Sequence, residues 1–502
     1  MDTSKDNAVL RVKVQRHSAS LEPPEHHVVA APAASFLSWP STSKSSQEST
    51  VKRKLDGFRN PWPSWHKPTS AEAWNSLQWG QEPPDPCIDL AASHLEPLPA
   101  STKAPVFHKK PTFGDINNWP DSSGAKATRL LSVEKPDFSF PSCQSKVTWL
   151  GHAGILVQLP PLRDTSGRPV RCLFDPMFSM RCSPSQTIGP VRSYPPPCDM
   201  EALPPIDAVF ISHNHYDHLD YDTIMAIWKN SQQTVRFFVP LGNGQWFIDS
   251  GIPAARVTEL DWWESAQLTD PVSESASLKI WCTPSQHGSG RPEVGVNTAL
   301  WSSWFLESQQ PGEDPYRVFF AGDTGYQFHD SPSWPPSPSQ SESEQEKHSN
   351  DAKFPPCPAF AKIRQRFGPP NLLLLPVSVG ATFAYLRSLV YLPDWLSPIP
   401  RHSPGVTGAN HMPAWDAVRV LNAMRGGEGG RADAKGSSPT VAIAMHWGTF
   451  VTDPIEVLRT LGQLEWACQK QGVRFARHLD DSSGTEEKPW FLALNHGQSI
   501  CI

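Results

Sequence analysis

The sequence predicts a mixed α/β (α+β) fold in which two β-sheets pack face to face and helices cover the outside. Three observations carry this prediction. Short apolar runs bounded by turn residues begin at Lys146 and continue toward the C-terminus, a pattern typical of buried strands. Helical patterns over residues 220–230 and 414–424 separate some of these runs. The 502 residues also include 20 Trp and 23 Phe, enough apolar bulk for a sizeable core.

The N-terminal part of the chain has a different composition. Residues 1–55 are rich in Ser, Pro, Ala and His and show no sustained hydrophobic period, so we expect a disordered tail. Residues 56–145 begin with the aromatic and proline-rich sequence FRNPWPSW, which favours an extended path over a helix. We expect this second part to be an arm that packs on the main domain.

The main domain is predicted to span residues 146–502. Its expected strands are VTWL, ILVQL, CLFD, AVFIS, RFFVP, LKIWC, RVFFAGD, LLLLPV and VAIAMH. Three stretches interrupt it. Residues 329–353 are polar and of low complexity, so we expect disorder there. Residues 389–405 and 426–438 are predicted surface insertions, and the first, which is apolar and proline-rich, fits a packed loop better than a segment resting on a bilayer.

Charge and targeting signals narrow the class of protein. The net charge of −6, with no run of Lys and Arg, argues against a nucleic-acid partner. Nine cysteines without paired spacing are typical of reduced thiols in an intracellular protein. No secretion signal or window of about 18 apolar residues is found. Arg11, Lys13 and Arg16 are typical of an organelle presequence, but Asp2 and Asp6 break its acid-poor pattern, so a mitochondrial location stays open.

One short segment carries most of the candidate chemistry. His213 and His215 follow the apolar run 207–212 as alternate residues, so in an extended chain both imidazoles project to one side and can share an ion. Asp217 and His218 come where a helical pattern begins, and the turn there can direct their side chains toward a second ion. A lone histidine is usually an ordinary core or surface residue. Four metal-capable side chains within six residues indicate a metal site.

Three further candidates stand at the ends of predicted strands. We predict two zinc ions per chain, each with three ligands and one shared bridge: His213, His215 and His287 on one ion, Asp217, His218 and His446 on the other, and Asp323 between them. Imidazole and carboxylate suit zinc, although iron and manganese fit the same ligand types. Two ions about 3.5–4 Å apart can lower the pKa of a bridging water. The predicted chemistry is therefore hydrolytic.

The ligand order, His-x-His-x-Asp-His followed by His, Asp and His, resembles that of metallo-β-lactamase-fold hydrolases. This resemblance implies an αββα sandwich. The surrounding sequences resemble the family of N-acylphosphatidylethanolamine-hydrolysing phospholipases D over residues 56–500: WLGHA, FDPMFSMRCSPSQTIGP, PPIDAVFISHNHYDHLDY, ELDWWE, TPSQHGSGR, FFAGDTGY and AMHWGTF. FRNPWPSW also belongs to the resemblance, which supports an arm over a free linker.

The family resemblance implies a substrate and a reaction. It implies hydrolysis of a membrane N-acylphosphatidylethanolamine to phosphatidic acid and N-acylethanolamine, peripheral contact with an intracellular membrane, and a homodimer. The alternative within the same fold is a hydrolase of a soluble ester, thioester, lactone or nucleic-acid phosphodiester. Gly154 and residues 376–387 depart from the family pattern near the pocket, which leaves the acyl-chain preference open.

The resemblance also implies roles for individual residues. Asp217 and Asp323 would be catalytic as metal ligands, and His152 would orient a ligand rather than bind metal. His411 would position the phosphate or act as general acid. The sequence alone supports an ordinary role equally well, because His411 stands just before Pro413 and a predicted helix.

Overall fold

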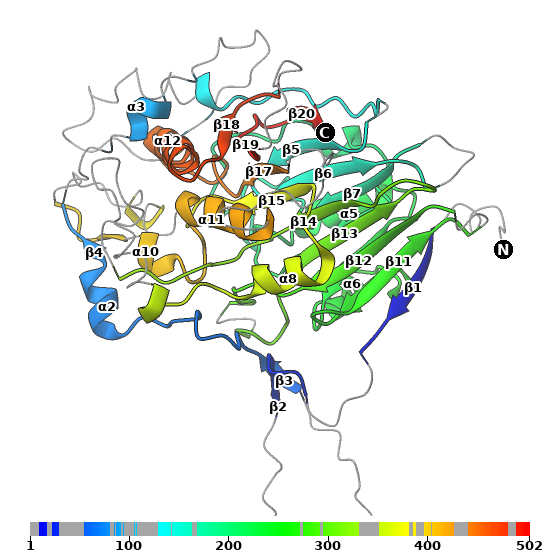
Figure 1. The fold of residues 1–502 in the computed structure, drawn as a ribbon, viewed down its shortest axis with the longest axis horizontal. Coiled ribbons are helices and arrows are strands. Elements are labelled where there is room, and N and C mark those ends of the chain that lie inside the picture. Colours follow the sequence, from blue (N-terminus) through cyan, green and yellow to red (C-terminus); the bar gives the residue numbers. More distant parts are fainter. Residues whose placement is uncertain are drawn as a thin grey trace, which may run out of the picture.

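The structure, a computed structural model, describes residues 10–17, 23–29, 55–80, 85, 87–91, 94, 105, 107, 129–141, 143–162, 168–271, 275–291, 295–330, 351–380, 385–387, 396–402, 404–425, 440–479 and 488–502. Within these residues two large sheets face each other and helices lie outside them (Figure 1). The predicted αββα sandwich is confirmed. None of the described helices is long and apolar enough to cross a membrane.

The larger sheet has nine strands in the order β1-β11-β12-β13-β14-β15-β17-β19-β18. Their bounds are Arg11–Gln15, Ser265–Thr269, Ser277–Thr283, Ser303–Gln309, Tyr316–Phe320, Leu372–Pro376, Val441–Met445, Trp490–Leu492 and Arg474–Ala476. Pairing is antiparallel from β1 to β14 and parallel from β14 onward. Three helices accompany this sheet (Figure 1): α8 (Ala359–Phe367), α11 (Ala414–Arg425) and α12 (Pro454–Lys470).

The smaller sheet has seven strands in the order β10-β9-β8-β7-β6-β5-β20. Their bounds are Val257–Leu260, Arg236–Pro240, Ala208–Phe210, Val170–Phe174, Gly154–Leu159, Lys146–Gly151 and Ser499–Cys501. Helices α5 (Tyr221–Asn230) and α6 (Gly244–Asp249) bury their apolar residues in a cluster with this sheet. Helices α5 and α11 thus occupy the two stretches in which the sequence predicts helices.

Shorter elements surround the sandwich. They are β2 (His27–Val29) paired with β3 (Leu55–Phe58), β4 (Leu77–Gln78) paired with β16 (Arg401–His402), the helices α2 (Ser70–Asn75), α3 (Cys87–Ala91) and α10 (Pro404–Thr407), and the 3-10 turns η2 (Met200–Ala202) and η3 (Ala254–Arg256).

Aromatic side chains fill the space between the sheets next to the functional loops. The ring of Phe174 on β7 stacks on Phe210 of β8 at 4.9 Å and on Phe320 of the opposite sheet at 4.7 Å. Phe210 in turn contacts Phe238 and Trp304. All five are fully buried, and each such side chain contributes about 1.5–3 kcal/mol of stability. The strand ends that carry the polar cluster described below are therefore rigidly held.

The expected disordered tail over residues 1–55 is wrong for two stretches. Residues 11–15 form β1, which pairs antiparallel with β11 and places Val12 opposite Leu268. Leu10 is buried in the core, and β2 pairs with β3. The overall Ser and Pro content hides a five-residue alternation of polar and apolar residues, RVKVQ, that suits an edge strand. The rest of this region lies outside the described residues.

Described parts of residues 56–145 contact the main domain. Phe58 is buried, and the indole of Trp62 stacks on that of Trp262 at 5.4 Å. Helix α3 lies against α12 so closely that a Cβ on Gly462 would stand 1.7 Å from the carbonyl oxygen of Cys87.

The three predicted interruptions of the main domain fall partly or wholly outside the described residues. Outside lie residues 331–350 of the first interruption, residues 389–395 and 403 of the second, and all of residues 426–438. The described end of the second interruption contains β16, which pairs with β4 of the arm.

Candidate metal centre

The predicted ligands come together where strands of both sheets end. Four lie on the loop between β8 and α5, and three follow β12, β14 and β17: His213, His215, Asp217 and His218, then His287, Asp323 and His446. All but Asp217 are buried. Segments that are more than 200 residues apart in the chain thus present imidazoles and carboxylates to one small volume.

Three imidazoles form the first group. The Nε2 atom of His213 lies 2.9 Å from Nδ1 of His215, which lies 3.4 Å from Nε2 of His287. These three nitrogens fall within 4.8 Å of one another. The structure therefore brings together the side chains predicted for the first ion.

The second group contains the three side chains predicted for the other ion. The Oδ2 atom of Asp217 lies 3.5 Å from Nε2 of His218 and 3.7 Å from Nε2 of His446. His152 joins this group, because its Nε2 lies 3.0 Å from the same Asp217 oxygen. That contact suits the orienting role expected for His152.

Asp323 lies between the two groups. Its Oδ2 is 3.9 Å from Nε2 of His213 and 3.2 Å from Nε2 of His218. Its Oδ1 is 3.1 Å from Nε2 of His446. One carboxylate thus faces both groups, which is the arrangement that a bridging ligand requires.

The cluster has the chemical character of a cation site. Three of its buried atoms, Nε2 of His218, Nε2 of His446 and Oδ1 of Asp323, have no hydrogen-bond partner among the described residues. Each unsatisfied buried polar atom costs about 1–3 kcal/mol. Because these atoms face one another, divalent ions would satisfy them together. The donor set contains no thiolate, so it suits zinc and also accepts iron or manganese.

Comparison with known proteins assigns the chain to a superfamily. Residues 170–332 match the model of the β-lactamase superfamily domain. This range contains six of the seven predicted ligands, all but His446. An uncharacterized protein of Mycobacterium tuberculosis is 31% identical over 350 residues, which cover 69% of this chain and 71% of that protein. The chain belongs to the metallo-β-lactamase superfamily. It is a hydrolase of that fold, and the fold implies a two-metal site at the His/Asp cluster.

Two relatives of this chain have names that state a function. The N-acyl-phosphatidylethanolamine-hydrolyzing phospholipase D 1 of Caenorhabditis elegans is 31% identical over 307 residues, 60% of this chain and 64% of that protein. The mitochondrial N-acyl-phosphatidylethanolamine-hydrolyzing phospholipase D of Saccharomyces cerevisiae is 26% identical over 390 residues, 75% and 65% of the two chains.

Asp175 forms a hydrogen bond with a histidine of the cluster, and it was not among the residues identified from the sequence. Its Oδ2 accepts a hydrogen bond from Nδ1 of His218 at 2.7 Å and another from the Ser212 hydroxyl. The Ser212 oxygen also lies 2.9 Å from Nδ1 of His213. These contacts turn the Nε2 atoms of both histidines toward Asp323, as outer contacts of metal-binding histidines commonly do.

The backbone is strained at three points of the site. His152, Asp175 and His446 have φ values of 50°, 35° and 61°, in a region that non-glycine residues seldom occupy. The strain is held in place by hydrogen bonds, such as that from the His446 amide to the His152 carbonyl oxygen. Strained residues persist where the surroundings over-determine them, and they gather at functional sites.

A glycine lets the loop of Asp323 approach the segment that contains His213. Gly322 has φ of +60°, and a Cβ there would lie 2.6 Å from the Ser212 Cβ. A larger residue would push Asp323 away from the first group.

Charge pairing within the cluster keeps its carboxylates ionised. Burial alone would raise the pKa of Asp323, but the nearby His218 and His446 outweigh burial and hold that pKa well below its usual range. Burial would lower the pKa of His446, yet Asp323 raises it to about 9. The two carboxylates therefore stay ionised near neutral pH and are available as ligands for cations.

His411 lies at the solvent-exposed edge of the cluster. Its Nδ1 is 3.6 Å from Oδ2 of Asp323, and its ring lies 4.8 Å from that of His287. The side chain keeps 21% of its surface exposed, against 1% for Asp323. His411 thus stands between the buried centre and solvent, two residues ahead of Pro413 as the sequence indicates.

Arg291 is a second residue that sequence reasoning missed. It is exposed, and its Nη1 lies 3.1 Å from Nε2 of His215. The amide of Gly290 donates to Oδ1 of Asn214 and so fixes this loop on the metal-binding segment. Its signals in the sequence were its nearness to His287 and its place at the end of TPSQHGSGR, which belongs to the family resemblance.

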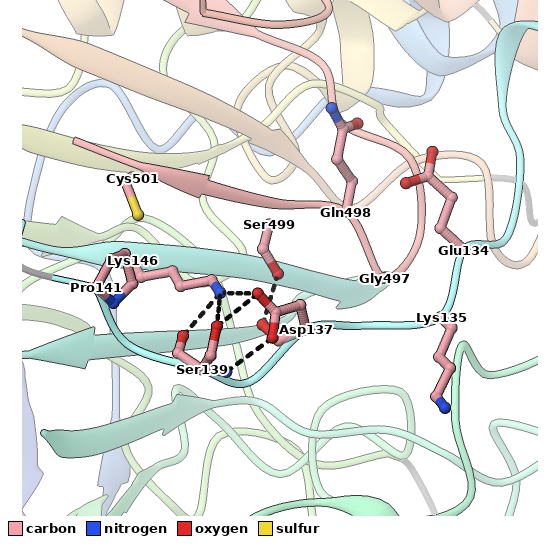
Figure 2. A pocket seen from close by; sticks show the side chains of 10 residues that line it. All are labelled: Glu134, Lys135, Asp137, Ser139, Pro141, Lys146, Gly497, Gln498, Ser499 and Cys501. Atoms are coloured by element: carbon pink, nitrogen blue, oxygen red, sulfur yellow. Dashed lines mark hydrogen bonds and ion pairs between the residues drawn. The ribbon is translucent and has the colours of Figure 1, made fainter. Parts of the chain in front are cut away.

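A cavity of about 410 Å³ is lined by residues other than the metal-binding side chains (Figure 2). Lys146 lines it, and its Nζ donates to Oδ2 of Asp137 and to the Ser139 carbonyl oxygen, each at 2.7 Å. Its other lining residues come from the segment after Val133, from β20 and from the two residues before β20. None of the seven predicted ligands lines it, so the candidate chemistry is at the His/Asp cluster.

Proposed function

We propose that this protein is a zinc-dependent phospholipase D that hydrolyses N-acylphosphatidylethanolamine to N-acylethanolamine and phosphatidic acid. The observation that carries the proposal is the pair of three-ligand groups joined by Asp323, with Arg291 at the edge of the first group. The names of the nematode and yeast relatives support the choice of substrate.

Two zinc ions held by these groups would supply a hydroxide near neutral pH and would neutralise phosphoryl oxygens. The chain's own residues make such a site ready to act. Asp175 fixes the ring of His218, and His152 fixes Asp217. Because these side chains are already oriented, little reorganisation is needed when the phosphodiester arrives.

Arg291 is suited to receive the phosphate of the substrate. If Nδ1 of His215 faces a metal ion, its Nε2 carries a proton, and this N–H then faces the guanidinium of Arg291. Two donors 3.1 Å apart cannot bond to each other, but both can turn to donate to one shared anionic oxygen. A phosphodiester supplies such an oxygen, whereas a neutral ester or a lactone supplies a weaker acceptor.

His411 is better suited to position the phosphate than to act as general acid. Burial lowers the pKa of His411 to about 3, against the opposing pull of Asp323. Its ring is therefore neutral at neutral pH, and a neutral ring donates a hydrogen bond without releasing a proton easily. This argument favours the first of the two roles expected for His411.

Exposed apolar side chains near the site support contact with a membrane surface. Met180 and Ile188 have 50% and 74% of their surface exposed, on the loop that contains Cys182. Burial, then the charge of Asp217, raises the pKa of Cys182, and Arg291 opposes this effect. The loop thus lies beside the metal centre, where its apolar residues can rest among lipid acyl chains.

A location and an assembly state are part of the proposal. The name of the mitochondrial yeast relative favours a mitochondrial membrane among intracellular ones. A homodimer, implied by the family resemblance, can be checked by light scattering of the purified chain.

The test is hydrolysis of vesicles that contain N-acylphosphatidylethanolamine by zinc-loaded protein. We expect equal amounts of N-acylethanolamine and phosphatidic acid, and loss of both with Asp323→Asn. Hydrolysis of soluble esters, thioesters, lactones or oligonucleotides, with none of the lipid, would support the alternative substrate classes. Release of neither lipid product from vesicles by fully loaded protein would overturn the proposal.

A further inference from the structure

Three metal-capable side chains also meet outside the metal centre, where the N-terminal segment crosses the main domain. The Nε2 atom of His26 lies 2.7 Å from Oδ1 of Asp261, and Nε2 of His27 lies 2.9 Å from Oδ2 of the same carboxylate. The two nitrogens and a carboxylate oxygen fall within 4.8 Å of one another. Each carboxylate oxygen therefore faces its own imidazole.

The contact between His27 and Asp261 does not have hydrogen-bond geometry. Nε2 of His27 is buried and makes no hydrogen bond within the described part of the chain, although a carboxylate oxygen is 2.9 Å away. In the metal centre the same combination occurs at His446, whose buried Nε2 lies 3.1 Å from Asp323 without a hydrogen bond. In both places the nitrogen and oxygen lone pairs can point to a common position rather than at each other.

The two rings are also arranged as in the metal centre. The ring centroids of His26 and His27 lie 4.6 Å apart with an interplanar angle of 76°. Those of His213 and His287 lie 4.6 Å apart at 78°. Adjacent residues in a regular strand point to opposite faces, but a turn before β2, closed by the hydrogen bond from the His27 amide to the Pro24 carbonyl oxygen, lets both rings converge.

The surroundings hold these side chains in place. The His26 ring stacks on Trp262 at 4.2 Å, and the Trp262 indole donates to the carbonyl oxygen of Trp301. The Trp262 amide donates to Oδ1 of Asp261. Exposed fractions of the His26, His27 and Asp261 side chains are only 6%, 13% and 8%. The site is closed, as structural metal sites are.

We propose that His26, His27 and Asp261 bind one further divalent transition-metal ion, for which zinc is the best match. Two imidazoles and one carboxylate suit zinc, cobalt or iron(II) better than calcium or magnesium. The proposal does not depend on the proposed phospholipase D activity.

The ion would join the N-terminal segment to the main domain. His27 begins β2, which pairs with β3, and Asn60 just beyond β3 donates a hydrogen bond to the carbonyl oxygen of His287. The third ion would thus fix the segment that supports a ligand of the metal centre. Its role would be structural, because the low exposure leaves little room for a substrate.

The experiment is a metal count on the full-length protein after loading with Zn²⁺ and removal of weakly bound ions. We expect the double variant His26→Ala/His27→Ala to hold about one zinc ion fewer per chain than the wild type. The matched control is His66→Ala, since His66 makes a comparable contact with Glu72 at 2.8 Å but has no second imidazole. This control should keep the wild-type count.

A second variant guards against misfolding of the first. Asp261→Asn keeps the shape of the side chain and an acceptor for the Trp262 amide, but it lacks the charge that a metal ion requires. It should also lose one ion. Equal zinc counts in the wild type and in either folded variant would overturn the proposal and leave ordinary His–Asp ion pairs.

A background variant separates this site from the metal centre. In Asp323→Asn protein, Co²⁺ titration should show one tightly bound ion more than in the double variant Asp323→Asn/Asp261→Asn. Equal counts in these two proteins would refute the third site, however many ions the metal centre itself retains.

Discussion

The Oδ2 atom of Asp175 lies 2.7 Å from Nδ1 of His218, and this contact decides which nitrogen of the ring faces Asp323. Both side chains are fully buried. A carboxylate behind an imidazole fixes its tautomer and increases its basicity. Asp175 is therefore a positioning residue, although it touches neither the proposed ions nor the substrate.

We predict that Asp175→Asn weakens metal binding by about 10- to 100-fold while the protein stays folded. The amide can donate to Nδ1, which would then leave the proton on Nε2, the atom that must accept a metal ion. Competition with a chromophoric chelator measures the affinity. Asp207→Asn is the control, because Asp207 is another poorly exposed carboxylate that pairs with Arg168 instead. Equal loss in both variants would contradict a specific role for Asp175.

Replacing the bridging carboxylate should have a larger effect. We predict that Asp323→Asn lowers kcat/KM by at least about 100-fold, because one amide cannot serve both ligand groups. The far-ultraviolet circular dichroism should remain that of the wild type, since the side-chain volume is unchanged. Activity within a few-fold of the wild type would show that Asp323 does not bridge.

Arg291 should affect substrate binding more than the chemical step. We predict that Arg291→Ala raises KM for the phospholipid by about 10-fold with a smaller change in kcat, and leaves the metal count unchanged. Arg291→Lys should recover only part of the affinity, since lysine cannot form a two-point contact with phosphate. The control is Lys279→Ala, which removes a half-exposed charge paired with Glu307. A loss of zinc in Arg291→Ala would contradict a role in phosphate binding.

The sequence predicted the ligands well because their signal is local. Four of the seven predicted ligands lie within His213–His218, and the apolar runs before His287, Asp323 and His446 mark strand ends. Asp175 gave no such signal. A single carboxylate after an apolar run is ordinary, and its importance depends on β7 pairing with β8, which places Asp175 beside Ser212.

The N-terminal strand was missed for a related reason. Strand β1 has five residues, and its partner β11 begins 250 residues later. Strand β1 is stabilised by pairing with the edge of the sheet at β11, and this edge exists only in the folded domain. Composition averaged over residues 1–55 cannot show such a contact. The cluster of His26, His27 and Asp261 has the same long-range origin.

A half-buried carboxyl group in α12 should make stability depend on pH. Burial, then the charge of Asp453, raises the pKa of Glu456 from 4.5 to about 7. A carboxyl group whose pKa is raised in the folded state costs no stability below its unfolded pKa, because it is protonated in both states. As the pH rises toward the folded pKa, the unfolded state releases the proton first, and the free energy of unfolding falls. The free energy of unfolding should therefore fall between about pH 4.5 and pH 7.

We predict that Glu456→Gln removes this fall. Glutamine keeps an oxygen for the hydrogen bond that Thr452 donates at 2.8 Å, but it carries no charge to bury. At pH 8 the variant should be more stable than the wild type by on the order of 2 kcal/mol, and at pH 4 the two should be equal. Urea unfolding at both pH values measures the difference, with the exposed Glu201→Gln as control. A variant that loses stability at pH 8 would show that the Glu456 charge is compensated in the folded protein.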